Sequence, residues 1–156
     1  MIKIIFSITV GLYLISCNSN RVYEQNADID KYWLADSTIQ FDFDINNSLQ
    51  DYNLYFNVRN GVNFPHSNLY FKYALKDSVG STLEAELVNF NLFHPKSGYP
   101  LGNGVGDIFE HQYELLVKYQ FPNNGKYQLS FQQYMRYDSL PEIYSVGYTI
   151  AKTVNQ

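Results

Sequence analysis

Apolar and polar residues alternate along most of the chain from Ile39 onward. In the segment Thr-Ile-Gln-Phe-Asp-Phe-Asp-Ile, residues 38–45, the apolar side chains would all point one way and the polar ones the other. A period of two residues is typical of a β-strand with one buried face and one exposed face. The alternation recurs, with varying regularity, in residues 52–59, 69–75, 83–92, 113–121, 127–135 and 144–151. The pattern therefore predicts seven or eight short strands.

A tight turn is predicted between two of these segments. Residues 122–125 read Pro-Asn-Asn-Gly, and an Asn-Gly pair favours a hairpin because glycine adopts a positive φ at no steric cost. We therefore expect residues 113–121 and 127–135 to be antiparallel neighbours in one sheet.

The predicted fold class is all-β. No apolar period of a helix extends over ten or more residues after Cys17, and Asn, Asp, Gly and Pro separate the predicted strands. Short strands without long helices favour a single two-sheet antiparallel β-sandwich, either jelly-roll or immunoglobulin-like. The alternation does not decide between these topologies. Since we find no internal repeat and no second boundary, we assign residues 36–156 to one β-sandwich domain.

The N-terminus has a different pattern. Lys3 precedes an apolar run, residues 4–15, which is shorter than the ~20 residues of a membrane-spanning helix and has the layout of a signal peptide. The run ends in Leu-Ile-Ser-Cys, which resembles the bacterial lipobox. We predict that residues 1–16 are a lipoprotein signal peptide and that Cys17, the only cysteine, is acylated. The alternative is an ordinary signal peptide or amphipathic anchor with a chance cysteine.

Residues 17–35 are polar with scattered charge, which favours a lipidated tether between membrane and domain. Two or three acyl chains would hold the protein at the membrane. Neither Asn18 nor Ser19 is acidic, so the inner-membrane retention signal is absent. We expect a lipid-anchored protein of the cell envelope, in the outer membrane, with the side that it faces left open.

Charge argues against one class of partner. Without residues 1–16, the chain keeps 10 basic and 15 acidic residues, a net charge of −5. Nucleic-acid binding needs a basic stripe that neutralises phosphates, and the three arginines are scattered. We expect no nucleic-acid partner.

Aromatic residues make up 17% of the chain, with 15 Tyr and 11 Phe. Such residues suit a pleated, half-buried surface, and tyrosine adds a polar rim to an apolar ring. Strand packing accounts for most of them, and a surface that stacks on sugars or peptide is the alternative.

Candidate catalytic and metal-binding groups are few. His66, His94 and His111 lie in separate segments, whereas zinc sites favour closely spaced ligands. Asp107 and Glu110 with His111 could hold an ion, although such a trio is more often a solvated turn. The chain has no Gly-x-Ser-x-Gly elbow and no phosphate loop. We predict no enzyme activity, no metal and no other cofactor.

Paired carboxylates occur twice on predicted strands. Asp42 and Asp44 share one face, as do Glu84 and Glu86, but acid-base catalysis needs two carboxylates in different environments. We expect both pairs on exposed faces, with the alternating apolar residues of 83–87 facing the core.

A glycine-rich loop reads Leu-Gly-Asn-Gly-Val-Gly-Asp-Ile, with Gly102, Gly104 and Gly106 at every second position. Glycine permits close backbone approach or positive φ. We expect a tight corner between sheets, and a ligand loop is the alternative.

Five ordered blocks of the chain resemble one known family. They read YNLYFNVRN, PHSNLYF, GYPLGNGVGDIFE, FPNNGKYQLSFQQYMR and LPEIYSVGYTIAK, and they are similar to successive blocks of the gliding-motility lipoprotein H family, GldH. The resemblance covers Cys17 and residues 22–152 and is loose between residues 77 and 97.

The resemblance implies an envelope lipoprotein that supports gliding motility and type IX secretion. An acylated sandwich without catalytic groups would suit a non-catalytic adaptor or scaffold that binds other gliding and secretion envelope proteins. The alternative is a carbohydrate-binding envelope module in which tyrosines and Trp33 stack on sugar rings. A groove lined by aromatic rings and rimmed by Asn or Asp would favour sugar, and a flat aromatic patch would favour protein.

Polar residues in or beside these blocks are the candidate interaction surface: Arg59, His66, Asn103, Asp107 and Arg136. Arg136 and Asp107 could equally form a structural ion pair.

Three serines follow an aspartate in predicted turns: Ser37, Ser78 and Ser139. The sequences around them resemble the O-glycosylation acceptors of gliding and gut bacteria, so these serines are possible O-glycosylation sites. The alternative is that Asp-Ser is simply favourable in turns.

Overall fold

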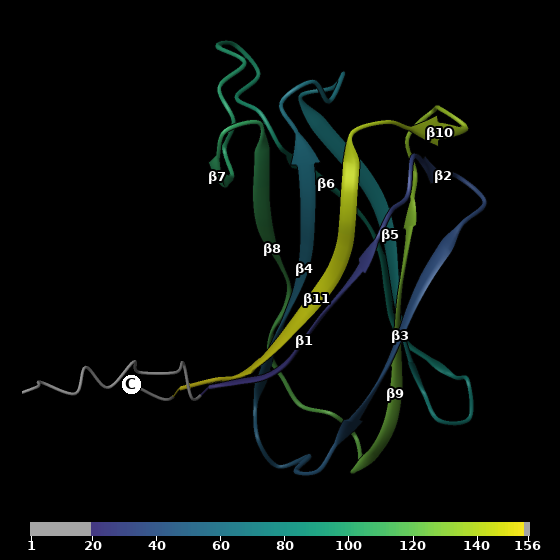
Figure 1. Cartoon of the computed structure of the whole chain (residues 1–156). Helices are drawn as coiled ribbons and strands as arrows, with labels where there is room; N and C mark the ends of the chain where they lie inside the picture. Colours follow the sequence, from purple (N-terminus) through teal and green to yellow (C-terminus); the bar gives the residue numbers. More distant parts are fainter. Residues whose placement is uncertain (1–19, 155–156) are drawn as a thin grey trace, which may run out of the picture.

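The computed structural model describes residues 20–154, which contain strands and no helix (Figure 1). No segment of this range forms a helix that could cross a membrane. The strands are β1 (Arg21–Asp28), β2 (Trp33–Leu34), β3 (Thr38–Ile45), β4 (Tyr52–Gly61), β5 (Asn68–Asp77), β6 (Thr82–Asn91), β7 (Asn103–Val105), β8 (Ile108–Tyr119), β9 (Gly125–Gln133), β10 (Ser139–Leu140) and β11 (Ile143–Lys152). The predicted all-β class is confirmed.

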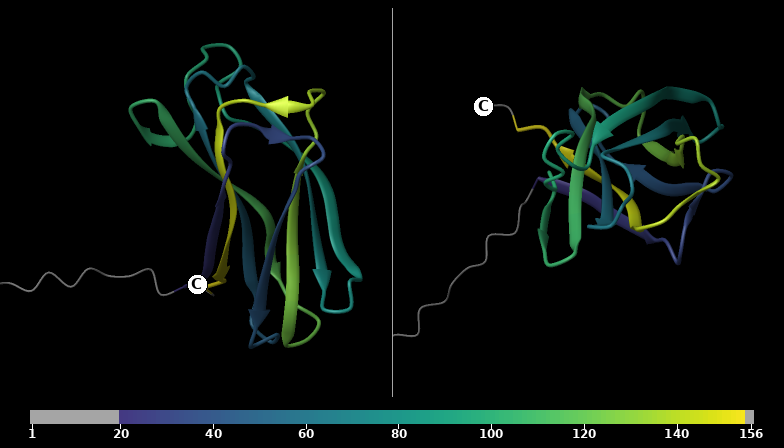
Figure 2. Two further views of the ribbon diagram at one scale, coloured as in Figure 1. Left: turned by 45° about the vertical axis from the view of Figure 1, so that its right-hand side comes forward. Right: turned by 90° about the horizontal axis from the view of Figure 1, so that it is seen from above.

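Two antiparallel sheets pack face to face as a sandwich (Figure 2). The five-stranded sheet has the order β1-β11-β4-β8-β7, and the four-stranded sheet has the order β3-β9-β5-β6. A short ribbon of β10 and β2 lies at one end (Figure 1).

The strand pairing is that of a jelly roll. Apart from the short β2, β7 and β10, the first long strand pairs with the eighth, the second with the seventh, the third with the sixth and the fourth with the fifth. This is the connectivity of one long hairpin rolled into two sheets. An immunoglobulin domain pairs its strands in a different order, so the structure decides between the two predicted topologies.

The hairpin expected between residues 113–121 and 127–135 is wrong. β8 pairs with β4 and β7 in the five-stranded sheet, and β9 pairs with β3 and β5 in the four-stranded sheet. Residues 122–125 therefore carry the chain across the end of the sandwich. The buried ring of Phe121 packs there against Tyr127, with centroids 4.7 Å apart, and the Tyr127 hydroxyl donates to the Asn123 carbonyl at 2.6 Å. Burial of these rings holds the turn without strand pairing.

The tether expected for residues 17–35 is wrong from residue 21 onward. β1 pairs with β11 over seven residue pairs, and the Tyr23 hydroxyl donates to the Asp44 carbonyl in β3 at 2.8 Å. Trp33 of β2 is only 1% exposed and is paired with Leu140 of β10, so it is not available to stack on a sugar. Most side chains of β1 are exposed because it is an edge strand, and its sequence therefore lacks an apolar alternation.

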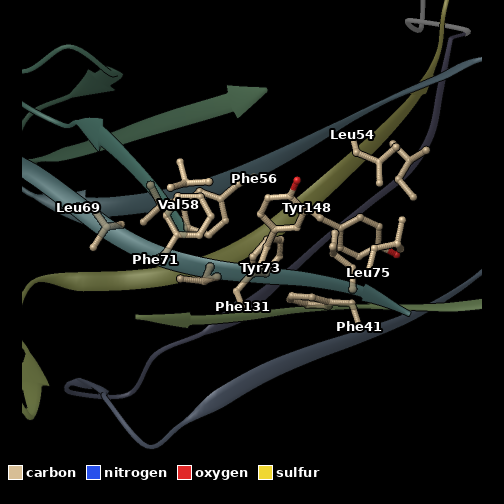
Figure 3. Packing of buried hydrophobic residues seen from close by; sticks show 14 of the residues in the cluster. Phe41, Leu54, Phe56, Val58, Leu69, Phe71, Tyr73, Leu75, Phe131 and Tyr148 are labelled. Atoms are coloured by element: carbon tan, nitrogen blue, oxygen red, sulfur yellow. The ribbon is translucent and has the colours of Figure 1, made fainter. Parts of the chain in front are cut away.

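Aromatic rings from both sheets form the core (Figure 3). Phe56 of β4 stacks on Phe71 of β5 with ring centroids 3.9 Å apart, and Phe131 of β9 lies edge-on to Phe56 at 4.9 Å. Tyr148 of β11 packs against Phe41 of β3 at 5.1 Å. Burial raises the pKa of Tyr148 to about 12 because the apolar surroundings disfavour a phenolate. Strand packing therefore accounts for much of the aromatic content.

The orientation expected for β6 is wrong. Glu86 is the register partner of Tyr73, and cross-strand partners share a face, so Glu84 and Glu86 lie on the inner side while Leu87 is exposed. Only Val88, farther along β6, is buried in the core. Burial, then the charges of Glu86 and Glu84, raise the pKa of Tyr73 to about 12. Inward-pointing charges on an edge strand discourage pairing with another chain.

Candidate functional site

A β-hairpin projects from one end of the five-stranded sheet (Figure 2). β7 pairs with the start of β8, so that Val105 lies opposite Ile108. The turn consists of Gly106 and Asp107, and Gly106 has a φ of +74°, which strains any residue with a Cβ. The glycine-rich loop thus forms a hairpin rather than the expected corner between sheets.

Apolar side chains are exposed around this hairpin. Val105 is 96% exposed, and the Val62 N–H donates to the Asp107 carbonyl at 2.8 Å, which brings the loop after β4 beside the hairpin turn. We call the exposed apolar residues of this end the tip surface: Val62, Tyr99, Leu101, Val105 and Ile108.

The tip surface lies far from the point where the described chain begins (Figure 1). Gly61, at the end of β4, is the partner of Ile108, whereas Tyr52, at its start, is the partner of Lys152 beside the beginning of β1. The two ends of β4 are therefore at opposite ends of the sheet, and β4 is ten residues long. At ~3.3 Å per residue, that is about 30 Å.

His111 packs beneath the glycine-rich loop. It is 7% exposed, and burial lowers its pKa to about 4 because the surroundings disfavour a charged ring. A Cβ on Gly102 would lie 2.6 Å from His111 Nε2, so only glycine allows this approach. Nε2 is buried and has no hydrogen-bond partner. His111 is therefore a neutral, covered residue.

The possible ion site at Asp107, Glu110 and His111 is not assembled. Neighbouring residues of a strand point to opposite faces, so Glu110 faces solvent while His111 faces inward. Across residues 20–154, no three His, Cys, Asp or Glu side chains are grouped so that they could hold a metal ion.

A polar groove of about 330 Å³ lies on the five-stranded sheet. The Gln112 amide donates to Asn57 Oδ1 at 3.0 Å, and the Asn57 amide donates to Thr149 Oγ1 at 2.8 Å. Arg21 and Glu24 of β1 form an ion pair at its rim. Since these groups satisfy one another, the groove is a surface network that stabilises the sheet.

A larger cleft of about 510 Å³ lies beside the four-stranded sheet. It lies between β5, β6 and the loop after β9. We call it the tyrosine cleft, and it is lined by Tyr70, Leu87, Tyr134, Met135, Arg136 and Tyr137.

The structure divides the five predicted surface residues between two regions. Arg59 of β4, Asn103 of β7 and Asp107 lie on the five-stranded sheet and its hairpin. His66 and Arg136 lie near the tyrosine cleft, where the His66 ring packs on Tyr137 with centroids 4.8 Å apart.

Asp107 and Arg136 do not form the ion pair that the sequence allowed. Within residues 20–154, the one ion pair joins Arg21 and Glu24. The tyrosines of the cleft were not singled out from the sequence, because high tyrosine content does not say which rings are exposed.

The three predicted glycosylation serines differ in accessibility. Ser37 and Ser78 are exposed and lie outside strands, and Ser78 follows Asp77, whose carboxylate accepts the Ser81 N–H at 2.8 Å. Ser139 lies in β10 and is partly buried, so the turn expected there is wrong. Ser37 and Ser78 keep the accessibility that modification requires.

Comparison with known proteins then gives the family. The family model described as GldH lipoprotein matches residues 21–150, nearly all of the sandwich. The chain belongs to the GldH lipoprotein family. GldH membership makes it a lipid-anchored envelope protein and confirms the resemblance in the sequence. Cys17, the predicted lipid attachment residue, lies outside the described residues and stays a prediction.

Two relatives align along most of the GldH chain. The gliding motility lipoprotein GldH homolog of Christiangramia forsetii is 32% identical and aligns over 97% of this chain and 95% of its own. The gliding motility lipoprotein GldH of Flavobacterium johnsoniae is 29% identical, over 90% of each chain.

Solved structures add no functional argument for this GldH chain. The infectious bursal disease virus VP2 subviral particle shows a TM-score of 0.41 and 15% identity over 96% of this chain and 37% of that one. The structure of the Gx strain of that virus shows a TM-score of 0.44 and 12% identity over 95% of this chain and 36% of that one.

Proposed function

We propose that this protein is a non-catalytic adaptor of the gliding motility and type IX secretion apparatus, held at the outer membrane by a lipid on Cys17. Family membership supports the motility role, since both relatives carry gliding motility in their names. In this proposal the sandwich presents a binding surface to other envelope proteins and performs no chemistry.

The observation that carries the adaptor role is the tip surface. Five apolar side chains are exposed at one end of the sandwich, and grouped exposed apolar residues are typical of protein-binding surfaces. Val105 stands at the hairpin turn with almost no contact to the rest of the domain. Its side chain costs solubility and adds little to stability, which favours a role in binding.

The position of the tip surface suits an adaptor. It lies about 30 Å from the beginning of β1, as counted along a ten-residue strand. A lipid on Cys17 would place the beginning of β1 nearest the bilayer. The tip would then face away from the membrane, where another envelope protein can reach it.

The absence of catalysis in this proposal is supported by His111. Burial lowers the pKa of His111, so the ring is uncharged at neutral pH, and its Nε2 is covered by Gly102. Asp42 and Asp44 are exposed on the outer face of β3, as the sequence predicted. They line an open groove of about 390 Å³ together with Lys76 and Lys126, and Asp42 accepts a hydrogen bond from the Gln128 amide at 3.0 Å.

The test is a crosslinked pulldown from native envelopes that compares Val105→Lys with the unchanged protein. The lysine of Val105→Lys should abolish the capture of proteins that bind the tip surface through apolar contacts. It should also reduce gliding when the variant is the only copy of the protein in the cell. The matched control is Val79→Lys, because Val79 is also an exposed valine, 82% accessible, but lies in the turn between β5 and β6. A Cys17→Ala variant should lose both membrane association and partners.

Two results would contradict the proposal. Equal capture of partners by Val105→Lys and Val79→Lys would show that the tip surface is not the docking surface. Retention of all partners by Cys17→Ala in a soluble fraction would show that the anchor is not needed for assembly.

A further inference from the structure

The tyrosine cleft is a built site. The buried side chain of Gln133 donates to the Tyr137 carbonyl at 2.9 Å and accepts from the Met135 N–H at 2.8 Å. The Tyr134 N–H donates to the Tyr70 carbonyl at 2.8 Å. These bonds fix the loop after β9 against β5, so the cleft is shaped before any ligand arrives, and a pre-shaped site loses less entropy on binding.

Three rings in the cleft are available for stacking. Tyr70, Tyr134 and Tyr137 are each roughly half exposed, and His66 supports Tyr137 from beside it with ring centroids 4.8 Å apart. A tyrosine presents an apolar face with a polar hydroxyl at its edge. Such a surface matches a sugar ring, which has C–H groups on its faces and hydroxyls around its rim.

The charge of the cleft selects the kind of sugar. Arg136 lines the cleft, no carboxylate lines it, and Arg136 forms no ion pair within residues 20–154. Lys72, the register partner of Leu87, faces the same side of the sheet. Two cations gather here on a chain whose net charge is −4. The guanidinium of Arg136 can hold a carboxylate by two parallel hydrogen bonds.

Two asparagines lie beside Tyr70 on the same face of the four-stranded sheet. Asn89 is the register partner of Tyr70, and its Oδ1 accepts from the Asn68 amide at 2.7 Å. The Asn89 amide N–H groups remain for a ligand hydroxyl. The cleft thus combines aromatic rings with an amide rim, which is the arrangement expected for a sugar site.

Size also favours a small ligand. The cleft volume of about 510 Å³ falls within the ~300–1,000 Å³ range of small-molecule pockets. We propose that the tyrosine cleft binds a carboxylate-bearing saccharide, with the sugar stacked on Tyr134 and Tyr137 and its carboxylate paired with Arg136. This site is separate from the tip surface and goes beyond the adaptor function.

The test is isothermal titration calorimetry of the full-length lipoprotein in detergent with two probes of equal length, oligogalacturonate and uncharged maltooligosaccharide. Oligogalacturonate should bind, and its affinity should fall as salt rises because the ion pairs are exposed. Arg136→Gln and Tyr137→Ala should each weaken binding about tenfold. Tyr137→Phe should keep most of the affinity, since it retains the ring.

The controls are Arg59→Gln and Tyr99→Ala, which remove an exposed arginine and an exposed tyrosine outside the cleft and should leave binding unchanged. Thermal unfolding of each variant checks that the fold is intact. The proposal is overturned if neither probe binds, if maltooligosaccharide binds equally well, or if the cleft and control variants behave alike. Capture of an envelope protein by a photo-crosslinker at Tyr134, undiminished by excess oligogalacturonate, would also overturn it. None of these outcomes depends on Val105, so the adaptor function is tested separately.

Discussion

Acidification should destabilise the domain through His111. The pKa of histidine is about 6.5 in an unfolded chain, and burial lowers that of His111 to about 4 in the fold. Between these values the unfolded chain binds a proton that the folded protein does not. The free energy of unfolding therefore falls as the pH falls from 6.5 to 4, and this group adds no further loss below pH 4. From pH 7.5 to pH 4.5, the expected loss is about 2.5 kcal/mol.

Urea unfolding at pH 7.5, 6.0 and 4.5 measures this loss. Trp33 is the only tryptophan and is 1% exposed, so its fluorescence reports unfolding directly. His111→Leu removes the titrating group and its unpaired nitrogen, while every carboxylate stays as in the unchanged protein. The unchanged protein should lose about 2.5 kcal/mol more than His111→Leu between pH 7.5 and pH 4.5.

The comparison can refute the reasoning. If both proteins lose the same free energy of unfolding over this range, then His111 either titrates normally in the fold or is protonated without penalty. In either case its burial under Gly102 would not control the pH dependence.

Two further predictions concern the core and β1. Phe71→Ala should lower the free energy of unfolding by about 3–5 kcal/mol, since Phe71 is fully buried and stacks on Phe56. Urea unfolding measures this loss. A loss below about 1 kcal/mol would contradict the packing described for Phe71. Replacing residues 21–28 by a Gly-Ser linker should cost at least about 3 kcal/mol through the Tyr23 ring and its hydrogen bond to Asp44, whereas a true tether could be replaced at no cost.

The sequence pattern located strands correctly where one face of the strand is buried and the other is exposed to solvent. Residues 38–45 show this best, since Phe41, Phe43 and Ile45 are buried and Asp42 and Asp44 are exposed. The sequence pattern is strong there because burial alone decides which residue types are tolerated on each face.

Pairing between strands could not be predicted in the same way. The Asn-Gly signal at residues 124–125 describes a local turn, but β8 and β9 find their partners in different sheets. In a jelly roll the partners of most strands are distant in sequence. The alternation in β6 predicted the wrong inward-facing residues. β6 is the edge strand of the four-stranded sheet, and water reaches its inner side, so Glu84 and Glu86 are tolerated there.

The candidate sites were predicted only in part. His66 and Arg136 lie near or in the tyrosine cleft, but Tyr70 and Tyr137 come from segments far apart in the chain. Their meeting depends on the pairing of β5 with β9, which the alternation does not contain. The lipid attachment at Cys17 rests on four adjacent residues and needs no knowledge of the fold.

The start of β1 at Arg21 limits the distance between the bilayer and the binding surface of the domain. Three residues separate Cys17 from Arg21, a distance of at most about 14 Å when fully extended. A flexible tether of 18 residues would instead spread the domain over about 23 Å. With an acylated Cys17, the β7–β8 hairpin would stay within about 45 Å of the lipid headgroups. Confinement to such a layer raises the effective concentration of any partner anchored in the same membrane.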